Sequence, residues 1–416
     1  MDPDNVDRQT LAARVVARIA ACALFLTGGD AVALFDDRLE VVVGQSATHD
    51  DNVFRLARGV DPVTALGTSD RSDTYHATSL GLKFDVPQAS HRYRGDLGVD
   101  RYQFERFSNL ELEGHHGSFD WTFSGVDALT SRLGYLESRT LASLSNIQGG
   151  AQSTAPNFID YRRTYAEASY EITPRWAFRA ELGRGAQENS ASLYTLSDMS
   201  VKTQDLELVY ATPAGTRIGL DTRFVAASLP NRQLVGLQAI DNSYDERHSS
   251  VFIEWQTSRH SRLDARFGRV HRGYEDLAAR NHTGSTYSVA YSWQPVDALT
   301  LTAIGQRGIS TTEEVNVGHV LMETVGLRSH WRHADRVELT LDLERGDRVY
   351  RGDPVFALGL VPQRSERVSV KAVGALLHLT PIVTLDFRWR NERRSANAAA
   401  GNYRVNVAGI GVRCSF

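Results

Sequence analysis

The chain has 416 residues, and its 46 Lys and Arg against 50 Asp and Glu give a formal net charge of −4. This balance lacks the basic excess of nucleic-acid-binding proteins, so no nucleic-acid partner is expected. The mean hydropathy of −0.32 resembles that of a soluble protein. Membrane β-barrels give a similar average, because their strands alternate lipid-facing and lumen-facing residues.

The first 33 residues have the pattern of an export signal. Three arginines precede an apolar run over residues 19–27, and the triplet Ala31-Val32-Ala33 offers a small-x-small cleavage pattern. We therefore expect residues 1–33 to be a signal peptide that is cleaved near Ala33, and residues 34–416 to form one mature domain. The alternative is an amphipathic first helix of a cytoplasmic protein.

Several later segments alternate apolar and polar residues, as half-buried strands do. In residues 175–182, 217–224, 337–344 and 383–390, every second residue is mainly apolar and its neighbours are mainly charged or small. No segment after the export signal approaches the roughly 18 apolar residues that a membrane helix needs. Alternation alone fits a soluble β-sandwich as well as a membrane barrel.

The connections between these segments favour a barrel, because tight connections and long polar stretches follow one another in turn. The tight connections lie near residues 87, 126–127, 174, 213, 259–260, 295–297, 334–335 and 381. Between them lie the long ones, near 50–71, 143–157, 190–200, 229–244, 351–363 and 391–401, with shorter ones near 108, 278 and 315. Short periplasmic turns and longer extracellular loops are typical of outer-membrane barrels. The sequence therefore predicts an all-β fold, a transmembrane antiparallel β-barrel of about 18 strands within a range of 16–20.

The chain ends on a strand-like segment, residues 403–416, whose apolar face runs from Ala408 to Phe416. Outer-membrane barrels end in this way. Gly411, Cys414 and Phe416 resemble the terminal signal that the barrel-assembly machinery reads, although an aromatic residue is expected in place of Cys414.

The charged residues of the alternating segments are the candidate lumen-lining residues. An Arg or Lys on the lipid face would cost about 2–4 kcal/mol at the bilayer midplane, so these side chains should point inward. They either form a ladder of ion pairs that stiffens the wall, or their guanidinium groups bind carboxylates or hydroxyls of a passing polyanion or glycan. The candidates are Arg175, Arg179, Glu181, Arg217, Asp221, Arg223, Arg262, Asp264, Arg266, Glu338, Asp342, Glu344, Asp386, Arg388 and Arg390.

Aromatic residues cluster near the predicted short turns, where an interfacial girdle would lie. The girdle candidates are Tyr170, Trp176, Tyr210, Trp255, Tyr291, Trp293 and Trp331. Further tyrosines could stack on sugar rings wherever they face inward, namely Tyr75, Tyr93, Tyr102, Tyr161 and Tyr165.

No catalytic motif is evident, and we expect neither enzyme activity nor a cofactor. His115-His116 and the pair His330 and His333 are interpreted as solvated surface and not as metal ligands. Asp50-Asp51-Asn52 has oxygen ligands suited to calcium, but an ordinary turn is the simpler interpretation. Of the two cysteines, only Cys414 would remain after cleavage, so no intramolecular disulfide or cysteine metal site is expected.

One segment carries a resemblance to a known family. Residues 48–56, Thr-His-Asp-Asp-Asn-Val-Phe-Arg-Leu, followed by Ser72-Asp73-Thr74 and Ser79-Leu80-Gly81-Leu82, resemble the opening of the exopolysaccharide-biosynthesis outer-membrane proteins called EpsL-like. The similarity in organisation covers the mature chain, whereas the matching residues are confined to its N-terminal part. The resemblance implies an outer-membrane barrel that is encoded with polysaccharide synthesis and export systems, and it implies no catalytic residues.

The function expected from this resemblance is support for the export of a bacterial exopolysaccharide through a charged aqueous lumen. The partners would be the polysaccharide polymer, outer-membrane lipid, the barrel-assembly machinery and inner-membrane polysaccharide synthesis or export proteins. Two alternatives stay open, a general or sugar-selective diffusion porin and a surface anchor for polysaccharide. Each of the three places the mature protein in the outer membrane of a Gram-negative bacterium.

Overall fold

The computed structural model describes residues 38–125, 128–144, 147–148, 151–152, 154–235, 238–310, 317–352, 364–397 and 401–416, and the predicted signal peptide lies outside them. The long strands are β1 (Leu39–Asp50), β2 (Asp73–Gln88), β3 (His91–Phe104), β4 (Leu112–Ser124), β5 (Leu129–Leu141), β8 (Phe158–Thr173), β9 (Trp176–Asn189), β10 (Met199–Ala211), β11 (Arg217–Ser228), β14 (Tyr244–Ser258), β15 (Ser261–Tyr274), β16 (His282–Val296), β17 (Leu299–Ser310), β18 (Val317–His333), β19 (Val337–Gly352), β20 (Ser365–His378), β21 (Val383–Ala396) and β22 (Tyr403–Ser415). The connections hold the hairpins β6 (Ile147–Gln148) with β7 (Ala151–Gln152) and β12 (Gln233–Val235) with β13 (Gln238–Ile240), the helix α2 (Pro62–Leu66) and the 3₁₀ helices η1 (Ser108–Leu110), η2 (Ser192–Ser197) and η3 (Ala278–Arg280).

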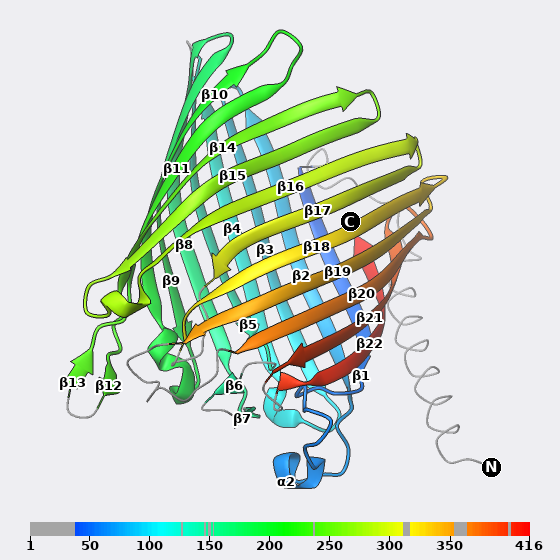
Figure 1. Cartoon of the computed structure of the whole chain (residues 1–416). Coiled ribbons are helices and arrows are strands. Elements are labelled where there is room, and N and C mark those ends of the chain that lie inside the picture. The colour runs from blue at the N-terminus through cyan, green and yellow to red at the C-terminus, as the bar shows by residue number, and fades with distance from the viewer. Residues whose placement is uncertain are drawn as a thin grey trace.

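The long strands form a closed barrel. They make a single 18-stranded antiparallel sheet in which each strand pairs with the next one along the chain (Figure 1). The sheet closes because β1 pairs with β22 as well as with β2. The predicted fold class and the predicted count of 18 strands are confirmed. The described part of the chain holds no helix that is long and apolar enough to cross a membrane.

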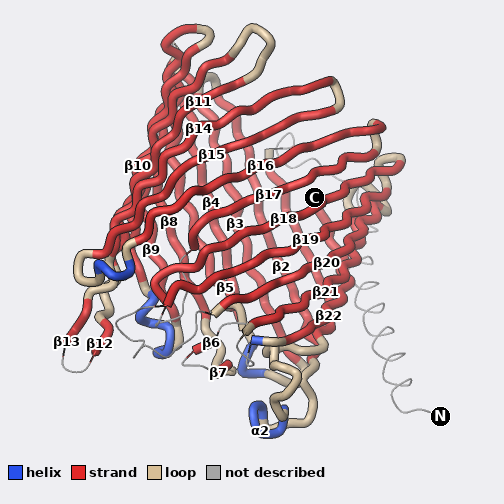
Figure 2. The backbone as a smooth tube through the Cα atoms, in the orientation of Figure 1, coloured by secondary structure: helices blue, strands red, loops and turns tan. Residues whose placement is uncertain are grey.

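The barrel has two unlike ends. Tight turns join the strands at one end, which we call the turn end, and the longer connections with α2, β6, β7, β12 and β13 gather at the other, which we call the loop end (Figure 2). The connections that the sequence marked with Pro or Asp, as far as the structure describes them, fall at the turn end, for example the turn after β8 and the turn after β18, while residues 126–127 lie outside the described residues. The alternation of short and long connections was therefore read correctly from turn chemistry.

The two faces of the barrel wall carry different side chains. Directly opposed residues in neighbouring strands share a face, so the pairing register assigns every strand residue to one of the two. The apolar face carries Leu182, which is 60% exposed, and Leu220, which is 57% exposed. The polar face carries Glu181 and Asp221, whose side chains are each only 12% exposed. This strict alternation is the pattern of a wall with lipid on one side and water on the other.

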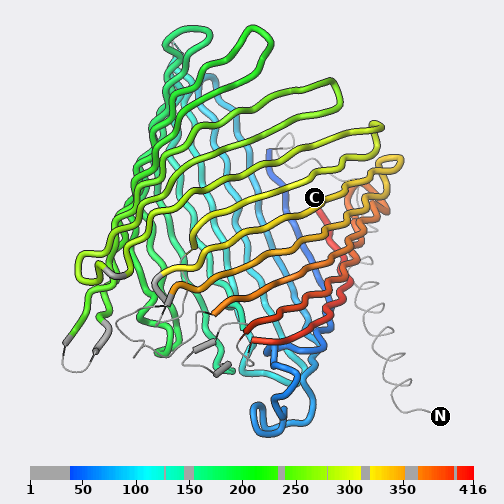
Figure 3. Tube along the Cα trace, viewed as in Figure 1, coloured from blue at the N-terminus to red at the C-terminus, as the bar shows by residue number. Residues whose placement is uncertain are grey.

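The first and last strands meet at the seam of the barrel, where blue β1 lies beside red β22 (Figure 3). The backbone N–H of Phe416 donates to the carbonyl of Val41 at 2.9 Å, and the N–H of Val41 donates to the carbonyl of Phe416 at 3.0 Å. The terminal aromatic residue therefore takes part in closing the barrel. Cys414 is buried on the apolar face, and Gly411 lies opposite Ser46 of β1.

The connection between β1 and β2 builds a small hydrophobic core at the loop end. Phe54 and Leu56 of this connection pack against Phe107 and Leu110, which flank and end η1. The rings of Phe54 and Phe107 meet edge to face, with 4.8 Å between their centroids. Farther along the connection, Asp61 caps α2, and the hydroxyl and backbone N–H of Thr64 hold the pKa of Asp61 below its usual value.

We expect Leu110→Ala to loosen this loop core without unfolding the barrel. Leu110 is fully buried, and removing its side chain should cost about 2 kcal/mol, within the range for Leu-to-Ala changes in cores. Because the loss is local, limited tryptic cleavage after Arg58 and Arg71 should become faster while the barrel stays folded. The matched control is Leu193→Ala in η2, where the leucine is exposed, and equal cleavage rates in the two variants would contradict the prediction.

Candidate functional site

The polar face of the barrel wall is the candidate functional site. By register, it carries every predicted lumen-lining residue except one: Arg179, Glu181, Arg217, Asp221, Arg223, Arg262, Asp264, Arg266, Glu338, Asp342, Glu344, Asp386, Arg388 and Arg390. The exception is Arg175, which lies in the turn between β8 and β9 and is exposed there. The prediction for Arg175 was wrong because it treated this residue as part of the alternating strand, whereas Pro174 and Arg175 belong to the turn.

Ion pairs follow one another around this face. Arg266 contacts Asp221 at 3.2 Å, and Arg223 contacts Asp205 at 3.6 Å. Other pairs are Arg179 with Glu167 at 2.7 Å, Arg217 with Glu254 at 2.9 Å, Arg262 with Asp264 at 2.8 Å, Arg328 with Asp342 at 3.5 Å, and Arg390 with Glu392 at 2.6 Å. Most partners come from a neighbouring strand, so the ion pairs connect adjacent strands of the wall. The polar face is therefore hydrophilic but has little excess of either sign.

Tyr165 lies in a further network of charged residues on this face. Its hydroxyl donates to Asp120, which also accepts a hydrogen bond from Arg132 at 2.8 Å. The guanidinium groups of Arg132 and Arg163 each lie 5.3 Å from the centre of the tyrosine ring, a distance suited to cation–π attraction. The ring lies across Gly134, where an added Cβ would come within 2.2 Å of it. Glycine at this position thus allows the tyrosine to lie flat along the wall.

Toward the loop end, the polar face holds charges that are buried. The side chain of Glu366 is 0% exposed and that of Arg394 is 2% exposed, and the two are hydrogen-bonded to each other. Glu366 also forms an ion pair with Arg364 at 2.8 Å and accepts a hydrogen bond from the Tyr350 hydroxyl at 3.0 Å. These residues were not among the sequence candidates. The alternation that selected Arg390 does reach Arg394 four residues later, so part of the signal was present.

A second buried pair lies on β14 and β15. Arg272 donates to Glu246 through Nε at 2.8 Å, and its Nη2 lies 2.7 Å from the same carboxylate oxygen. The Arg272 guanidinium also lies 4.2 Å from the ring centre of Tyr244. The loop end of the polar face therefore carries tightly held aromatic and charged groups, whereas the pairs nearer the middle of the wall are partly exposed.

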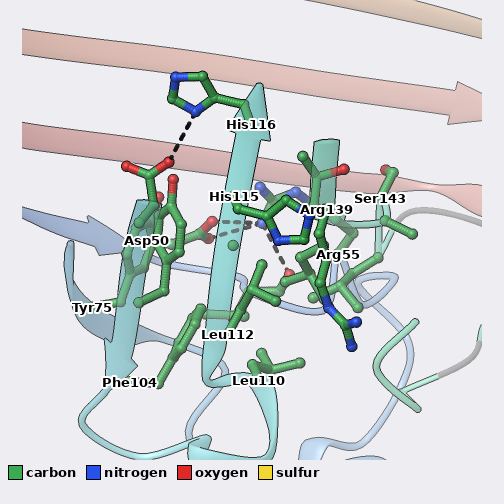
Figure 4. A pocket seen from close by; sticks show the side chains of 18 residues that line it. Asp50, Arg55, Tyr75, Phe104, Leu110, Leu112, His115, His116, Arg139 and Ser143 are labelled. Atoms are coloured by element: carbon green, nitrogen blue, oxygen red, sulfur yellow. Dashed lines mark hydrogen bonds and ion pairs between the residues drawn. The ribbon is translucent and has the colours of Figure 1, made fainter. Parts of the chain in front are cut away.

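A pocket of about 400 Å³ opens on the polar face beside the β1–β2 connection (Figure 4). Tyr75, Tyr102 and Phe104 supply aromatic rings to its lining, with 5.0 Å between the ring centres of Tyr75 and Phe104. His116 adds an imidazole, whose Nδ1 lies 3.7 Å from an oxygen of Asp100. An apolar pocket with a few converging polar groups is the usual form of a small-molecule site.

The turn that follows β1 is locked by its own hydrogen bonds. Asp50 accepts from Arg55 at 2.8 Å, and Asp51 accepts from the backbone N–H and the side-chain amide of Asn406 at 2.8 and 2.7 Å. The side-chain amide oxygen of Asn52 accepts from the backbone N–H of Leu56 at 2.9 Å. The acidic run therefore fastens the β1–β2 connection to β22, which is a structural role.

The histidine pairs of the sequence do not come together as ligands. Adjacent His115 and His116 point to opposite faces of β4, and His330 and His333 fall on opposite faces of β18. His330 contacts Glu338 at 3.1 Å, while His333 stacks on Trp331. Within the described residues, no group of three or more His, Cys, Asp or Glu could hold a metal ion.

The aromatic residues divide between the faces. All seven girdle candidates lie on the apolar face near the turn end, as the register of Tyr210 with Trp176 and of Leu299 with Trp331 illustrates. Of the less certain tyrosines, Tyr93 lies on the apolar face. Tyr75, Tyr102, Tyr161 and Tyr165 lie on the polar face.

Comparison with known proteins agrees with this geometry. A family model described as "Putative beta-barrel porin 2" matches residues 245–416, which is less than half of the chain. No curated protein matches the chain. The expected EpsL-like family is not shown by these comparisons.

Solved porin structures align along nearly the whole chain. A BenF-like porin from Pseudomonas fluorescens Pf-5 has a TM-score of 0.50 and 11% identity, with 91% of this chain and 98% of that chain covered. OccK2 (OpdF) from Pseudomonas aeruginosa has a TM-score of 0.51 and 12% identity, with 91% and 97% covered. OccK9 (OpdG) from the same species has a TM-score of 0.51 and 13% identity, with 91% and 98% covered. The fold of this chain is that of a porin, a closed antiparallel 18-stranded barrel.

Proposed function

We propose that the chain is a diffusion porin of a bacterial outer membrane, which lets small hydrophilic solutes such as sugars and sugar acids cross through a lumen lined by the polar face. The observation that carries this proposal is the closed 18-stranded barrel with ion pairs around one face of its wall. Barrels of 16–18 strands leave an aqueous channel, whereas barrels of about eight strands are filled by their own side chains.

The exposure of the side chains supports the polar face as the inner one. Side chains that point into a closed barrel crowd one another, while those outside spread apart. Glu181 and Asp221 are largely covered although they belong to no hydrophobic cluster, and Leu182 is well exposed on the other face. The exposed leucines and the aromatic girdle then face lipid, where apolar side chains are most stable.

Small solutes fit this barrel better than a polymer does. The aligned structures are porins, and OccK2 was also solved in complex with glucuronate. The pocket beside Tyr75 and Tyr102 has the volume of a small-molecule site, and its aromatic and charged lining suits a sugar or a sugar acid. Of the three functions that the sequence left open, the diffusion porin is therefore favoured over exopolysaccharide export and over a polysaccharide anchor.

The paired charges indicate how such a channel would select among solutes. Because most arginines of the polar face have an acidic partner, the lumen offers many weak polar contacts and no strong potential of one sign. Neutral sugars would pass as readily as small ions, and selection would depend mainly on size and hydrogen bonding.

Conductance in a planar bilayer and swelling of liposomes test this proposal. The purified mature barrel should give steady ion conductance, and liposomes that contain it should swell in small sugars but not in polymeric dextran. Absence of conductance from folded barrel would refute the porin. Undiminished permeation of dextran would instead favour export of a polymer.

A further inference from the structure

The apolar face of the barrel is electrically asymmetric between its two ends. In the turn-end half of every described strand, this face carries no Lys, Arg, Asp or Glu, and the aromatic girdle lies there. Basic strand residues of this face lie in the loop-end half, and they include Arg101, Arg139, Arg162, Arg184, Lys202, Arg247, Arg269, Arg307, Arg345, Arg367, Lys371, Arg393 and Arg404. We call this set the basic belt.

Acidic partners account for only part of the belt. Arg101, Arg139, Arg162 and Arg367 each lie within 4.0 Å of an Asp or Glu. Among the residues that the structure describes, no ion pair is found for the others, and these are exposed: Arg184, Lys202, Arg247, Arg269, Arg307, Arg345, Lys371, Arg393 and Arg404. The polar face differs, because most of its arginines are paired. The belt therefore has positive charge that the protein itself does not neutralise.

Two places in the belt oppose like charges directly across neighbouring strands. Arg184 of β9 is the register partner of Lys202 of β10, and Arg393 of β21 is the register partner of Arg404 of β22. Like charges directly opposite each other in a sheet are destabilising. An anion bound between the two side chains would remove the repulsion, and the planar guanidinium is well suited to a phosphate.

We propose that the nine belt residues without an acidic partner bind the phosphorylated headgroups of lipids in the membrane leaflet on the loop-end side, with Arg184–Lys202 and Arg393–Arg404 as the two main sites. The belt borders the lipid-facing apolar band on the same face of the wall, so a headgroup reaches it while its acyl chains lie against the leucines. A soluble polyanion would lack this second contact. The proposal requires only that the barrel lies in a membrane, and it does not depend on the channel.

The test compares double variants of the two sites with a matched control. Arg184→Gln with Lys202→Gln, and Arg393→Gln with Arg404→Gln, remove the opposed charges. The control, Arg101→Gln with Arg162→Gln, removes the same charge from residues that have acidic partners. Binding of lipid A, a phosphorylated glycolipid, to the detergent-solubilised barrel is measured by native mass spectrometry, with phosphatidylcholine as the uncharged comparison.

We expect each site variant to bind lipid A about fivefold more weakly for every charge removed, the effect of one basic residue at an anionic surface. The control should bind almost as the parent does. In phosphatidylcholine alone, the site variants should be at least as stable as the parent, because the repulsion is gone. Arg393→Lys with Arg404→Lys should retain binding, since the charge is kept.

Four results would overturn the proposal. They are parental lipid A affinity in both site variants, equal binding of phosphatidylcholine, displacement of lipid A by inorganic phosphate at matched concentration, and preferential binding of a soluble anionic polysaccharide. Displacement by inorganic phosphate would mean that the belt is a simple anion site. Preference for the soluble polysaccharide would mean that the belt is a polysaccharide-binding surface. None of these results would bear on the conductance that tests the porin.

Discussion

Replacing Glu366 with glutamine is expected to lower the free energy of unfolding by about 3–5 kcal/mol, the usual cost of removing one partner of a buried ion pair. The side chain of Glu366 is fully buried and forms ion pairs with Arg394 and Arg364, and it accepts a hydrogen bond from the Tyr350 hydroxyl. Glutamine keeps the shape of the side chain but not its charge. The two arginines would then share an apolar and aromatic surrounding without the anion that compensates them.

Unfolding in urea, followed by the loss of β-sheet signal in vesicles, measures this change. The matched control is Asp347→Asn, which makes the same chemical change in an exposed pair with Arg367 on the adjoining strand. Exposed pairs contribute at most about 1 kcal/mol, so the control should unfold close to the parent. Equal destabilisation in both variants would mean that the buried ion pair of Glu366 contributes no more to the free energy of unfolding than the exposed pair does.

The barrel could be predicted from the sequence because the two signals that define its strands and turns each depend on only a few neighbouring residues. Alternation at every second residue assigned the faces of β9, β11, β19 and β21, and turn-forming Pro and Asp residues separated short connections from long ones. Both signals follow from geometry within a few residues. The failure at Arg175 has the same origin, since alternation carries no information on where a strand gives way to its turn.

The candidate site was less predictable, because its contacts depend on register between strands. Asp221 of β11 meets Arg266 of β15, and Asp120 of β4 meets Tyr165 of β8. Each pair is separated by 45 positions along the chain. Alternation states that such residues share a face but not which of them are neighbours. The pocket near Tyr75 also depends on the β1–β2 connection, which supplies Val53 and Arg55 to its lining. No periodic pattern in the sequence predicts this conformation of the connection.

Removing positive charges from the polar face and removing negative charges from it should shift the ion selectivity of the channel in opposite directions. Arg223→Gln with Arg266→Gln leaves Asp205 and Asp221 without their partners, and the channel should then prefer cations. Asp205→Asn with Asp221→Asn leaves the arginines and should make it prefer anions. A unit charge about 4 Å from a passing ion contributes about 1 kcal/mol in water, so the cation-to-anion permeability ratio should change by at least about fivefold.

The reversal potential across a salt gradient measures this ratio, and its dependence on salt identifies the cause. The shift should be large near 0.1 M salt, where the screening length is about 10 Å, and should fade near 1 M, where it is about 3 Å. Each variant is the control for the other, because both remove the same two ion pairs and differ only in the sign of the charge left behind. If neither variant moved the reversal potential at low salt, the conducting path would not pass along β11 and β15, and the polar face would act only as a brace for the wall.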